Sequence, residues 1–437
     1  MSEITNALST AKKRLLAVFD EASFSEIDAF AKSADGEIEA AAGYGTVNGI
    51  PAYAFSQEPS VSGGAISFAQ CAKIKKIYSL AAKTGCPVIG IYDSNGVKLK
   101  EGFEALTAYG EIVKASASVS GVVPQISVIA GACLGTSALV ANMADVVIAV
   151  KDADFYVTAP SEITAEASAA EGTVDILAED FSAAAEKVKD IISLLPANNL
   201  DFPPVFDCGE ISDADLSALK GMDLINALGS NSVELKKAYA ENVTTALAVI
   251  GGMPVGFAVF GGEPLCPACA YKTEAFVKLC DAFNLPIITV VDANGFIREK
   301  ENQMLVAATK LTSAYASATC PKISLITGNA IGAAYITLAG RASNADLAFA
   351  WDSAVVSPLE TESAVAFLFS ERLAAGESRE ALEAEYKETL GSPFTAAASG
   401  ALDDVFTPQE TAAKLIAALE ILSGKRETTI PRKHSVK

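Results

Sequence analysis

The chain repeats itself, and this repeat is the feature that most constrains its fold. Residues 87–96 (PVIGIYDSNG) match residues 286–295 (PIITVVDANG) 199 positions later, and residues 124–131 match residues 321–328 at an offset of 197. Self-similarity at a nearly constant offset is typical of a duplicated structural unit. We therefore expect two copies of one domain in tandem.

Each copy alternates short apolar runs with helical patterns. Residues 88–92 and 323–326 are continuous apolar runs, as in strands that are covered on both faces of a sheet. Residues 65–84 and 269–283 have the apolar spacing of helices that pack on a core. Strands alternating with helices predict a protein of the α/β class.

A proline-punctuated stretch at residues 196–204 separates the two copies. Clustered Pro and Asn residues favour turns and linkers over helices and strands. We place the boundary near residue 215, which gives an N-terminal domain over residues 1–215 and a C-terminal domain over residues 216–437.

The charge balance and the single histidine exclude several classes of function. The chain has 33 Lys and Arg against 53 Asp and Glu, a net charge of −20, whereas a nucleic-acid groove needs clustered cations. Because His434 is the only histidine, Ser-His-Asp and Cys-His triads and His-rich metal sites are not expected.

The sequence gives no sign of export or of a membrane span. The first residues lack the apolar core and cleavage site of a signal peptide. Residues 115–144 are uncharged, but Pro124, Gln125 and Asn142 interrupt them, so a buried strand, a glycine turn and a buried helix explain the stretch better. We expect a cytoplasmic protein.

The eight cysteines are scattered, which fits reduced thiols better than a disulfide framework. Cys266 and Cys269 form the one close pair, without the second pair or the histidines of a zinc site. We interpret them as incidental small apolar residues, with metal binding or redox chemistry as the alternative, and we expect no metal ion.

An apolar strand followed by a glycine-rich turn and a helix occurs in both copies, at residues 128–137 and 325–335. Unpaired backbone N–H groups at such a helix start can stabilise an oxyanion, which requires no histidine. The alternative is a purely structural turn in which glycine permits close packing. Asp93 and Asp292 end the preceding apolar runs, and we interpret them as capping residues, with a catalytic carboxylate as the alternative.

The sequence also resembles a known family, the carboxyltransferase subunits of biotin-dependent acyl-CoA carboxylases and decarboxylases, of the propionyl-CoA carboxylase β and methylmalonyl-CoA decarboxylase α type. The resemblance runs almost end to end. It is carried by motifs at residues 43–49, 63–64, 122–129, 195–200, 280–286, 321–322, 350–351 and 393–405.

The resemblance implies tandem duplicated crotonase-like (ββα spiral) domains, with an active site between the N-terminal domain of one subunit and the C-terminal domain of another. The acyl-CoA would bind mainly to the N-terminal domain, and biotin, attached to a separate carrier protein, mainly to the C-terminal domain. Backbone N–H groups would stabilise the thioester enolate and the biotin ureido oxygen, while biotin would supply the carboxyl group and the base.

By position in the family, the resemblance assigns catalytic and substrate-binding residues. The catalytic set is Gly135 and Thr136 for the enolate, and Gly332, Ala333 and Ala334 for biotin. The substrate-binding set is Gly63, Gly64, Gly96, Val97, Gly131, Gly295 and Phe296. Both turns depart from the family's glycine pairs, at Thr136 and at Ala333, but such changes keep the backbone donors.

The resemblance further implies partners: a biotin carboxyl carrier protein, carboxylase or decarboxylase subunits, and further copies of this chain, as a dimer or a trimer of dimers. Membrane association would occur only through those partners. The tail at residues 431–434 tilts the expected substrate towards short-chain acyl-CoA. The lysines at 73, 75, 76, 98 and 100 could contact CoA phosphates or form solvated faces.

Two other functions remain open from the sequence. The chain could be a noncatalytic or assembly subunit that keeps the fold, because the substituted turns lie near both ligand positions. It could also be a crotonase-like enzyme that acts on CoA esters without biotin, which would require a carboxylate between the helix starts.

Overall fold

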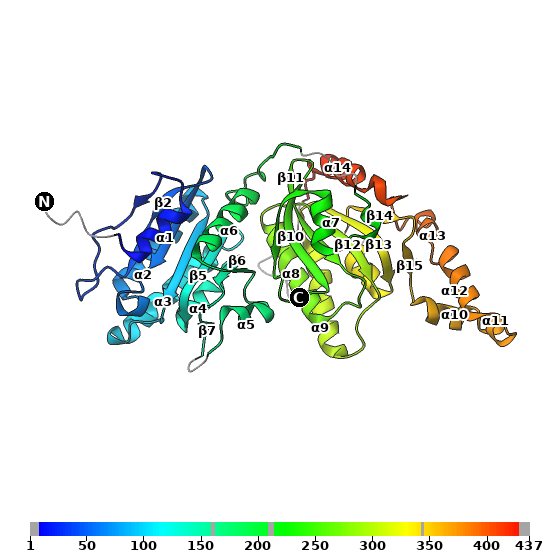
Figure 1. The fold of residues 1–437 in the computed structure, drawn as a ribbon, viewed down its shortest axis with the longest axis horizontal. Helices are drawn as coiled ribbons and strands as arrows, with labels where there is room; N and C mark the ends of the chain where they lie inside the picture. Colours follow the sequence, from blue (N-terminus) through cyan, green and yellow to red (C-terminus); the bar gives the residue numbers. More distant parts are fainter. Residues whose placement is uncertain (1–7, 159–161, 209–213, 342–344, 428–437) are drawn as a thin grey trace. The chain divides into compact units, whose positions relative to one another are not determined.

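The protein, described here from a computed structural model over residues 8–158, 162–208, 214–341 and 345–427, divides into two compact units (Figure 1). The N-terminal unit comprises Met1–Pro204 with Lys236–Tyr239, and the C-terminal unit comprises Val205–Leu235 with Ala240–Lys437. The tail at residues 431–434 lies outside the described residues. In these four ranges, no helix is long and apolar enough to cross a membrane.

The N-terminal unit is built on a mixed sheet of eight strands in the order β1-β2-β3-β4-β5-β6-β8, with β7 paired to β5. β1, β2 and β3 are antiparallel neighbours, and the remaining pairs are parallel. The strands are β1 (Ser25–Glu26), β2 (Ala40–Val47), β3 (Ile50–Gln57), β4 (Val88–Ser94), β5 (Gln125–Leu134), β6 (Val146–Val150), β7 (Phe155–Tyr156) and β8 (Ile176–Ala178). The helices are α1 (Thr10–Val18), α2 (Phe68–Thr84), α3 (Phe103–Val119), α4 (Thr136–Ala141), α5 (Ala165–Ala170) and α6 (Phe181–Leu194).

The C-terminal unit has a second sheet of eight strands in the order β16-β14-β13-β12-β11-β10-β9, with β15 paired to β13. The strands are β9 (Ser230–Leu235), β10 (Val243–Ile250), β11 (Met253–Phe260), β12 (Ile287–Ala293), β13 (Lys322–Ile331), β14 (Leu347–Trp351), β15 (Val355–Ser357) and β16 (Asp404–Phe406). The helices are α7 (Gly221–Leu228), α8 (Pro267–Ala282), α9 (Glu301–Ser317), α10 (Thr361–Leu368), α11 (Ser370–Ala374), α12 (Arg379–Glu388), α13 (Pro393–Ala398) and α14 (Thr411–Leu422).

The two sheets repeat each other strand for strand, which confirms the predicted α/β class and the duplication. The hairpin β2–β3 corresponds to β10–β11, and the parallel pair β4–β5 corresponds to β12–β13. Even the irregularity is duplicated, because the register shifts after Tyr92 in one unit and after Val291 in the other. A shift at this place re-aims the strand ends that lead into the glycine turns.

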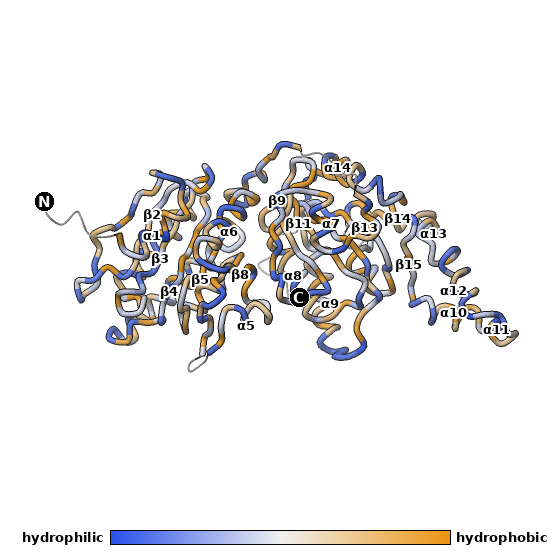
Figure 2. The backbone as a smooth tube through the Cα atoms, viewed as in Figure 1, coloured by the Kyte–Doolittle hydropathy of each residue, from blue (hydrophilic) through white to orange (hydrophobic). Residues whose placement is uncertain are grey.

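Burial follows from the sequence pattern. The central strands are buried almost throughout, and hydrophobic colour is concentrated along the strands inside each unit (Figure 2). Helix α2 begins where the Ser67 side chain accepts a hydrogen bond from the Gln70 N–H at 3.4 Å, and it ends at Gly85, whose φ is +66°. The uncharged stretch 115–144 contains the end of α3, then β5 and α4, as expected from its sequence.

Two equivalent aspartates fix the start of a central strand in each unit. Asp145 accepts a hydrogen bond from the Gln125 N–H at 2.8 Å, and Asp346 accepts one from the Lys322 N–H at 2.7 Å. Lys425 pairs with Asp346 at 2.9 Å, whereas Asp145 has no ion-pair partner within the described ranges. Burial without a cation raises the pKa of Asp145 to about 7.

We expect Asp145→Asn to remove a pH-dependent loss of stability. Because the folded pKa lies above the unfolded value of about 4, the folded state binds the proton more tightly, and the free energy of unfolding falls between about pH 4 and pH 7. The free energy of unfolding of the variant minus that of wild type should therefore increase by about 2 to 3 kcal/mol between about pH 5 and pH 8. Urea unfolding followed by circular dichroism measures the difference.

The control is Asp346→Asn, which leaves the Lys425 ammonium without this carboxylate. It should lower the free energy of unfolding at both ends of this pH range. A constant difference between Asp145→Asn and wild type across this pH range would contradict the prediction.

Candidate functional site

The glycine turn after β5 leaves backbone donors unpaired. The Gly135 N–H donates to the Tyr156 carbonyl at 2.9 Å, and this bond joins the end of β5 to β7. No carbonyl in the described part of the chain accepts the N–H of Thr136 or Ser137, which open α4. The first N–H groups of a helix lack an intrahelical partner, so they are available to a ligand if they are accessible. Ser137 is fully buried, whereas Thr136 is partly exposed.

The C-terminal unit repeats this arrangement. The Gly332 N–H donates to the Ser357 carbonyl at 2.8 Å, and within the described ranges the N–H groups of Ala333 and Ala334 have no acceptor. Ala334 is fully buried and Ala333 is exposed. In both units, therefore, the glycine N–H is engaged, and the residue that follows has an unpaired N–H and is itself at least partly exposed.

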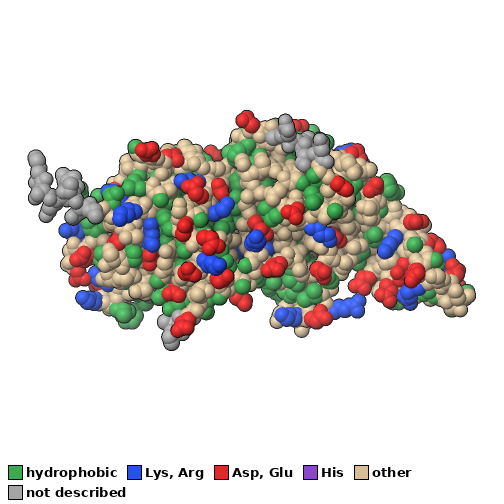
Figure 3. All heavy atoms as spheres, viewed as in Figure 1, with side chains coloured by type: hydrophobic (Ala, Val, Ile, Leu, Met, Phe, Trp, Pro, Cys, Tyr) green, Lys and Arg blue, Asp and Glu red, His purple; other side chains and the backbone are tan. Residues whose placement is uncertain are grey.

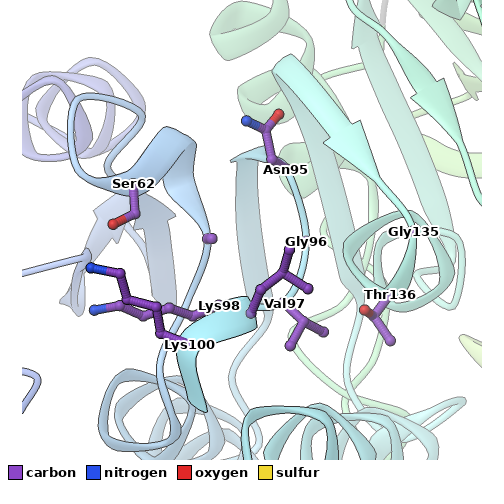
Figure 4. Close-up of a pocket in the computed structure, with 10 residues that line it drawn as sticks. Ser62, Asn95, Gly96, Val97, Lys98, Lys100, Gly135 and Thr136 are labelled. Atoms are coloured by element: carbon purple, nitrogen blue, oxygen red, sulfur yellow. The ribbon is translucent and has the colours of Figure 1, made fainter. Parts of the chain in front are cut away.

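A cavity of about 390 Å³ lies beside the first turn (Figure 4). Its lining brings together four of the residues that the sequence assigned to the site: Gly96, Val97, Gly135 and Thr136. Val97 and Thr136 come from neighbouring turns, and neither N–H has an acceptor in the described structure. Val97 therefore joins Thr136 as a candidate oxyanion donor. The remaining lining residues are Ser62, Ala65, Asn95, Lys98, Leu99 and Lys100.

Gly63 and Gly64 form the loop between Ser62 and Ala65, where the backbone leaves no room for a side chain at Gly64 and a side chain at Gly63 would have to displace Asn95. A Cβ on Gly64 would lie 1.8 Å from the Asp93 carbonyl oxygen, and one on Gly63 would lie 2.4 Å from Asn95 Nδ2. Both glycines also have positive φ, at 61° and 72°. These residues bring one wall of the cavity close to the strand that forms the other.

Gly131 does not line the cavity and lies against the carboxylate of Asp93. A Cβ on Gly131 would lie 2.4 Å from Asp93 Oδ1, and the other carboxylate oxygen pairs with Arg14 Nη2 at 2.8 Å. The expected capping role of Asp93 is wrong, because the Gly96 N–H donates to Ser94 Oγ instead, at 3.0 Å. Asp93 forms a partly buried ion pair with Arg14, a partner that sequence reasoning missed.

A buried polar network fixes the cavity wall in the N-terminal unit. The Tyr109 hydroxyl lies 3.1 Å from the Gly96 carbonyl oxygen and 2.9 Å from Ser137 Oγ, so it joins the two turns. Gln57 extends the network to Ser137 and to the Asp93 N–H. Burial raises the pKa of Tyr109, which keeps its hydroxyl protonated as a donor. Sequence reasoning missed this network, because its members lie far apart in the chain.

Of the five lysines singled out in the sequence, four are already paired. Lys98 donates to Glu39 Oε1 at 2.6 Å and pairs with Asp35 at 2.8 Å, and the hydrogen bonds to Asp35 and Glu39 raise its pKa. The other three are likewise engaged: Lys73 with the Ala40 carbonyl, Lys75 with Glu111 and Lys76 with Asp28. Lys100 is exposed at the cavity and has no hydrogen-bond or ion-pair partner among the described residues, although its charge acts on nearby Asp35.

In the C-terminal unit, the sequence-assigned residues lie on two turns at one edge of the sheet. Ala293 pairs with Ala330, so the turn at Gly295 and Phe296 and the turn at Gly332 leave neighbouring strands. The Leu265 N–H donates to the Gly295 carbonyl at 2.9 Å, which fixes the first of these turns. In the described part of the chain, no group of His, Cys, Asp and Glu could hold a metal ion.

A second, larger cavity of about 720 Å³ lies against the other side of α4, and sequence reasoning gave no indication of it. Its walls are mostly apolar and come from α4, β7 and α5. They are formed by Ala138, Leu139, Asn142, Phe155, Tyr156, Val157, Thr158, Ile163, Ala167, Ser168, Ala170, Glu171 and Thr173.

Comparison with known proteins shows which family the chain resembles. The carboxyl transferase domain model matches residues 5–436. Methylmalonyl-CoA decarboxylase subunit alpha of Propionigenium modestum is 31% identical, over 97% of this chain and 92% of that protein. The propionyl-CoA carboxylase beta chain of Saccharopolyspora erythraea is 33% identical, over 97% of this chain and 89% of that protein.

Among solved structures, a hexameric transcarboxylase 12S with bound methylmalonyl-coenzyme A superimposes with a TM-score of 0.91 at 31% identity, over 97% of this chain and 91% of that chain. The resemblance found in the sequence and the tandem crotonase-like fold that it implied are thereby confirmed. The chain belongs to the carboxyl transferase family.

Proposed function

We propose that this chain is the carboxyltransferase subunit of a biotin-dependent complex that moves a carboxyl group between biotin and a short-chain acyl-CoA. The observation that carries the proposal is the cavity that Val97 and Thr136 both line, because neither N–H has an acceptor among the described residues. N–H dipoles fixed in a partly enclosed site stabilise an enolate oxygen without reorganising during the reaction. The names of the relatives, which act on methylmalonyl-CoA and propionyl-CoA, support this substrate class.

In this proposal, the N-terminal unit holds the thioester. Val97 and Thr136 donate to its oxygen, Gly63 and Gly64 let the loop approach, and Lys100 contacts a phosphate of CoA. Gly96 and Gly135 shape the two turns, while Gly131 makes room for the Asp93–Arg14 ion pair behind them.

The C-terminal unit takes biotin, which is carried by a separate biotin carboxyl carrier protein and supplies the carboxyl group and the base when bound. Ala333 offers the accessible N–H for the ureido oxygen, next to the turn at Gly295 and Phe296. Gly332 forms the bend, and Ala334 is buried beneath it. The ureido oxygen of biotin is a neutral hydrogen-bond acceptor and needs only such N–H donors, so the residues present fit biotin.

The wider assembly follows from the same proposal. We propose a homo-oligomer, a dimer or a trimer of dimers, that works in the cytoplasm with carboxylase or decarboxylase partner subunits. The hexamer named for the transcarboxylase 12S structure supports the larger assembly.

The two alternatives have less support. A noncatalytic subunit would be expected to have lost its donors, yet Thr136 and Ala333 keep free N–H groups despite the substituted turns. A biotin-independent enzyme would need a carboxylate at the cavity, and the described lining contains two lysines and no carboxylate.

Carboxyl exchange between a biotin carrier and methylmalonyl-CoA or propionyl-CoA tests the function directly. We expect exchange by the wild-type chain and a loss of about 10² to 10³ in kcat for Thr136→Pro, which deletes one N–H at a helix position that accepts proline. Thr136→Ala keeps the N–H and should stay within about threefold of wild type. Equal activity of folded Thr136→Pro and Thr136→Ala would overturn the assigned donor, and no exchange with any short-chain thioester would overturn the function.

Tyr109→Phe tests the network that positions the two turns. Loss of the hydroxyl removes its bonds to Gly96 and Ser137, so kcat/KM should fall by about fivefold to twentyfold and stability by about 1 kcal/mol. The matched control is Tyr315→Phe, which removes the 2.7 Å bond to Thr289 in the C-terminal unit. It should cost similar stability but leave kcat/KM for acyl-CoA unchanged, and the same fall in kcat/KM in both variants would argue for a general packing effect.

Lys100→Ala tests the phosphate contact. Because Lys100 lacks a partner in the described residues, its removal should raise KM for acyl-CoA by about threefold to tenfold with little change in kcat. Lys75→Ala, which removes a lysine already paired with Glu111 at 2.7 Å, is the control and should leave KM unchanged. If KM for CoA esters were unchanged in Lys100→Ala, Lys100 would not contact a phosphate of CoA, and the prediction would be wrong.

A further inference from the structure

The cysteine pair that the sequence presented as incidental occupies the start of α8. Cys266 is the N-cap of this helix, and its Sγ accepts a hydrogen bond from the Cys269 N–H at 3.1 Å. Cys269 is 2% exposed, whereas Cys266 is only half-buried. One thiol can therefore be reached from solvent, and the second lies beneath it on the same face of the helix.

The duplicated unit shows that the fold does not require cysteine at this place. Ser67 stands 199 positions earlier, caps α2 and accepts a hydrogen bond from the Gln70 N–H at 3.4 Å. Serine is among the preferred N-cap residues, so a hydroxyl satisfies the same backbone. The two thiols therefore add a property that the helix start does not need.

The environment makes the two thiols unequal. The hydrogen bond from the Cys269 thiol, together with weaker bonds from backbone N–H groups, outweighs burial and lowers the pKa of Cys266, whereas the same contact together with burial raises the pKa of Cys269. Burial instead raises the pKa of four other cysteines: Cys71, Cys133, Cys280 and Cys320. The nearby charged group is Lys272, whose Nζ donates to the Val243 carbonyl at 2.7 Å.

We propose that Cys266 and Cys269 form a redox-active dithiol that hydrogen peroxide oxidises to an intramolecular disulfide. The Cys266 thiolate attacks the peroxide oxygen, the O–O bond breaks, and the leaving hydroxide takes a proton to form water, which leaves a sulfenic acid on Cys266. Cys269 then loses its proton and attacks this sulfur, so that the S–S bond forms and a second water leaves. Two thiols lose two electrons and two protons, and the peroxide is reduced to water.

The two cysteines lie next to the turn at Gly295, which belongs to the proposed biotin site. Leu265, directly before Cys266, donates its N–H to the Gly295 carbonyl at 2.9 Å and accepts from the Ile297 N–H at 3.1 Å. The dithiol proposal itself does not rest on carboxyl transfer, and its test reads the thiols directly.

The test treats the reduced full-length chain with hydrogen peroxide, blocks the remaining thiols and maps the peptides by mass spectrometry. We expect a Cys266–Cys269 disulfide that dithiothreitol reverses. Cys266→Ser, which keeps a capping side chain, should abolish it, and Cys269→Ser should leave a sulfenic acid on Cys266 that dimedone traps. Cys208→Ser, which removes an exposed thiol, should not affect it.

Two results would overturn the proposal: both thiols remaining free in the folded protein, or Cys266 passing to the sulfonic acid without a disulfide.

A second experiment measures the reaction rate of Cys266 with dithiodipyridine in the Cys86→Ser/Cys208→Ser protein. The rate at Cys266 should fall less than about twofold from pH 8 to pH 7, whereas a thiol of pKa about 8.5 loses about eightfold. An eightfold fall would show an ordinary thiol and would likewise contradict the proposal.

Discussion

One backbone hydrogen bond in each unit determines which N–H groups of the glycine turn remain unpaired. The Gly135 N–H is held by the Tyr156 carbonyl, and the Gly332 N–H is held by the Ser357 carbonyl. Each bond ends a long strand and turns the chain so sharply that the next residues cannot pair within the sheet. Glycine is needed because φ is +59° at both positions. The accessible N–H groups of Thr136 and Ala333 are a consequence of this bend.

The two units share this bend but differ in what surrounds it. In the N-terminal unit, Gln57, Tyr109 and Ser137 connect the turn to its neighbour through buried hydrogen bonds. Phe260 and Ala334 stand at the positions of Gln57 and Ser137 in the C-terminal unit, so the network has no counterpart there. Buried polar networks rigidify their surroundings when every member is satisfied. The duplication thus kept the backbone geometry while the side chains diverged.

The sequence predicted the elements that depend on local pattern. The repeat, the apolar strands and the glycine turns are visible without coordinates, and four residues that the resemblance singled out, Gly96, Val97, Gly135 and Thr136, line one cavity. What it could not predict depends on pairs of distant residues. Arg14 with Asp93 and Glu39 with Lys98 are separated by dozens of positions, and no local signal shows which lysine stays unpaired. The availability of each N–H likewise depends on β7 and β15, two short strands with little sequence signal.

The pairing of Lys98 affects how quickly a charged ligand can arrive. The chain carries a net charge of −20, and Figure 3 shows acidic side chains spread over the visible surface among the basic ones. Because Glu39 and Asp35 are two carboxylates against the one ammonium of Lys98, the charge of Lys100 only brings this group of four side chains to neutrality, and the cavity offers an approaching polyanion no net positive charge. The long-range field of the protein then opposes encounter, and only the last few ångströms favour it. Added salt screens the repulsion, so association is accelerated by ionic strength rather than slowed.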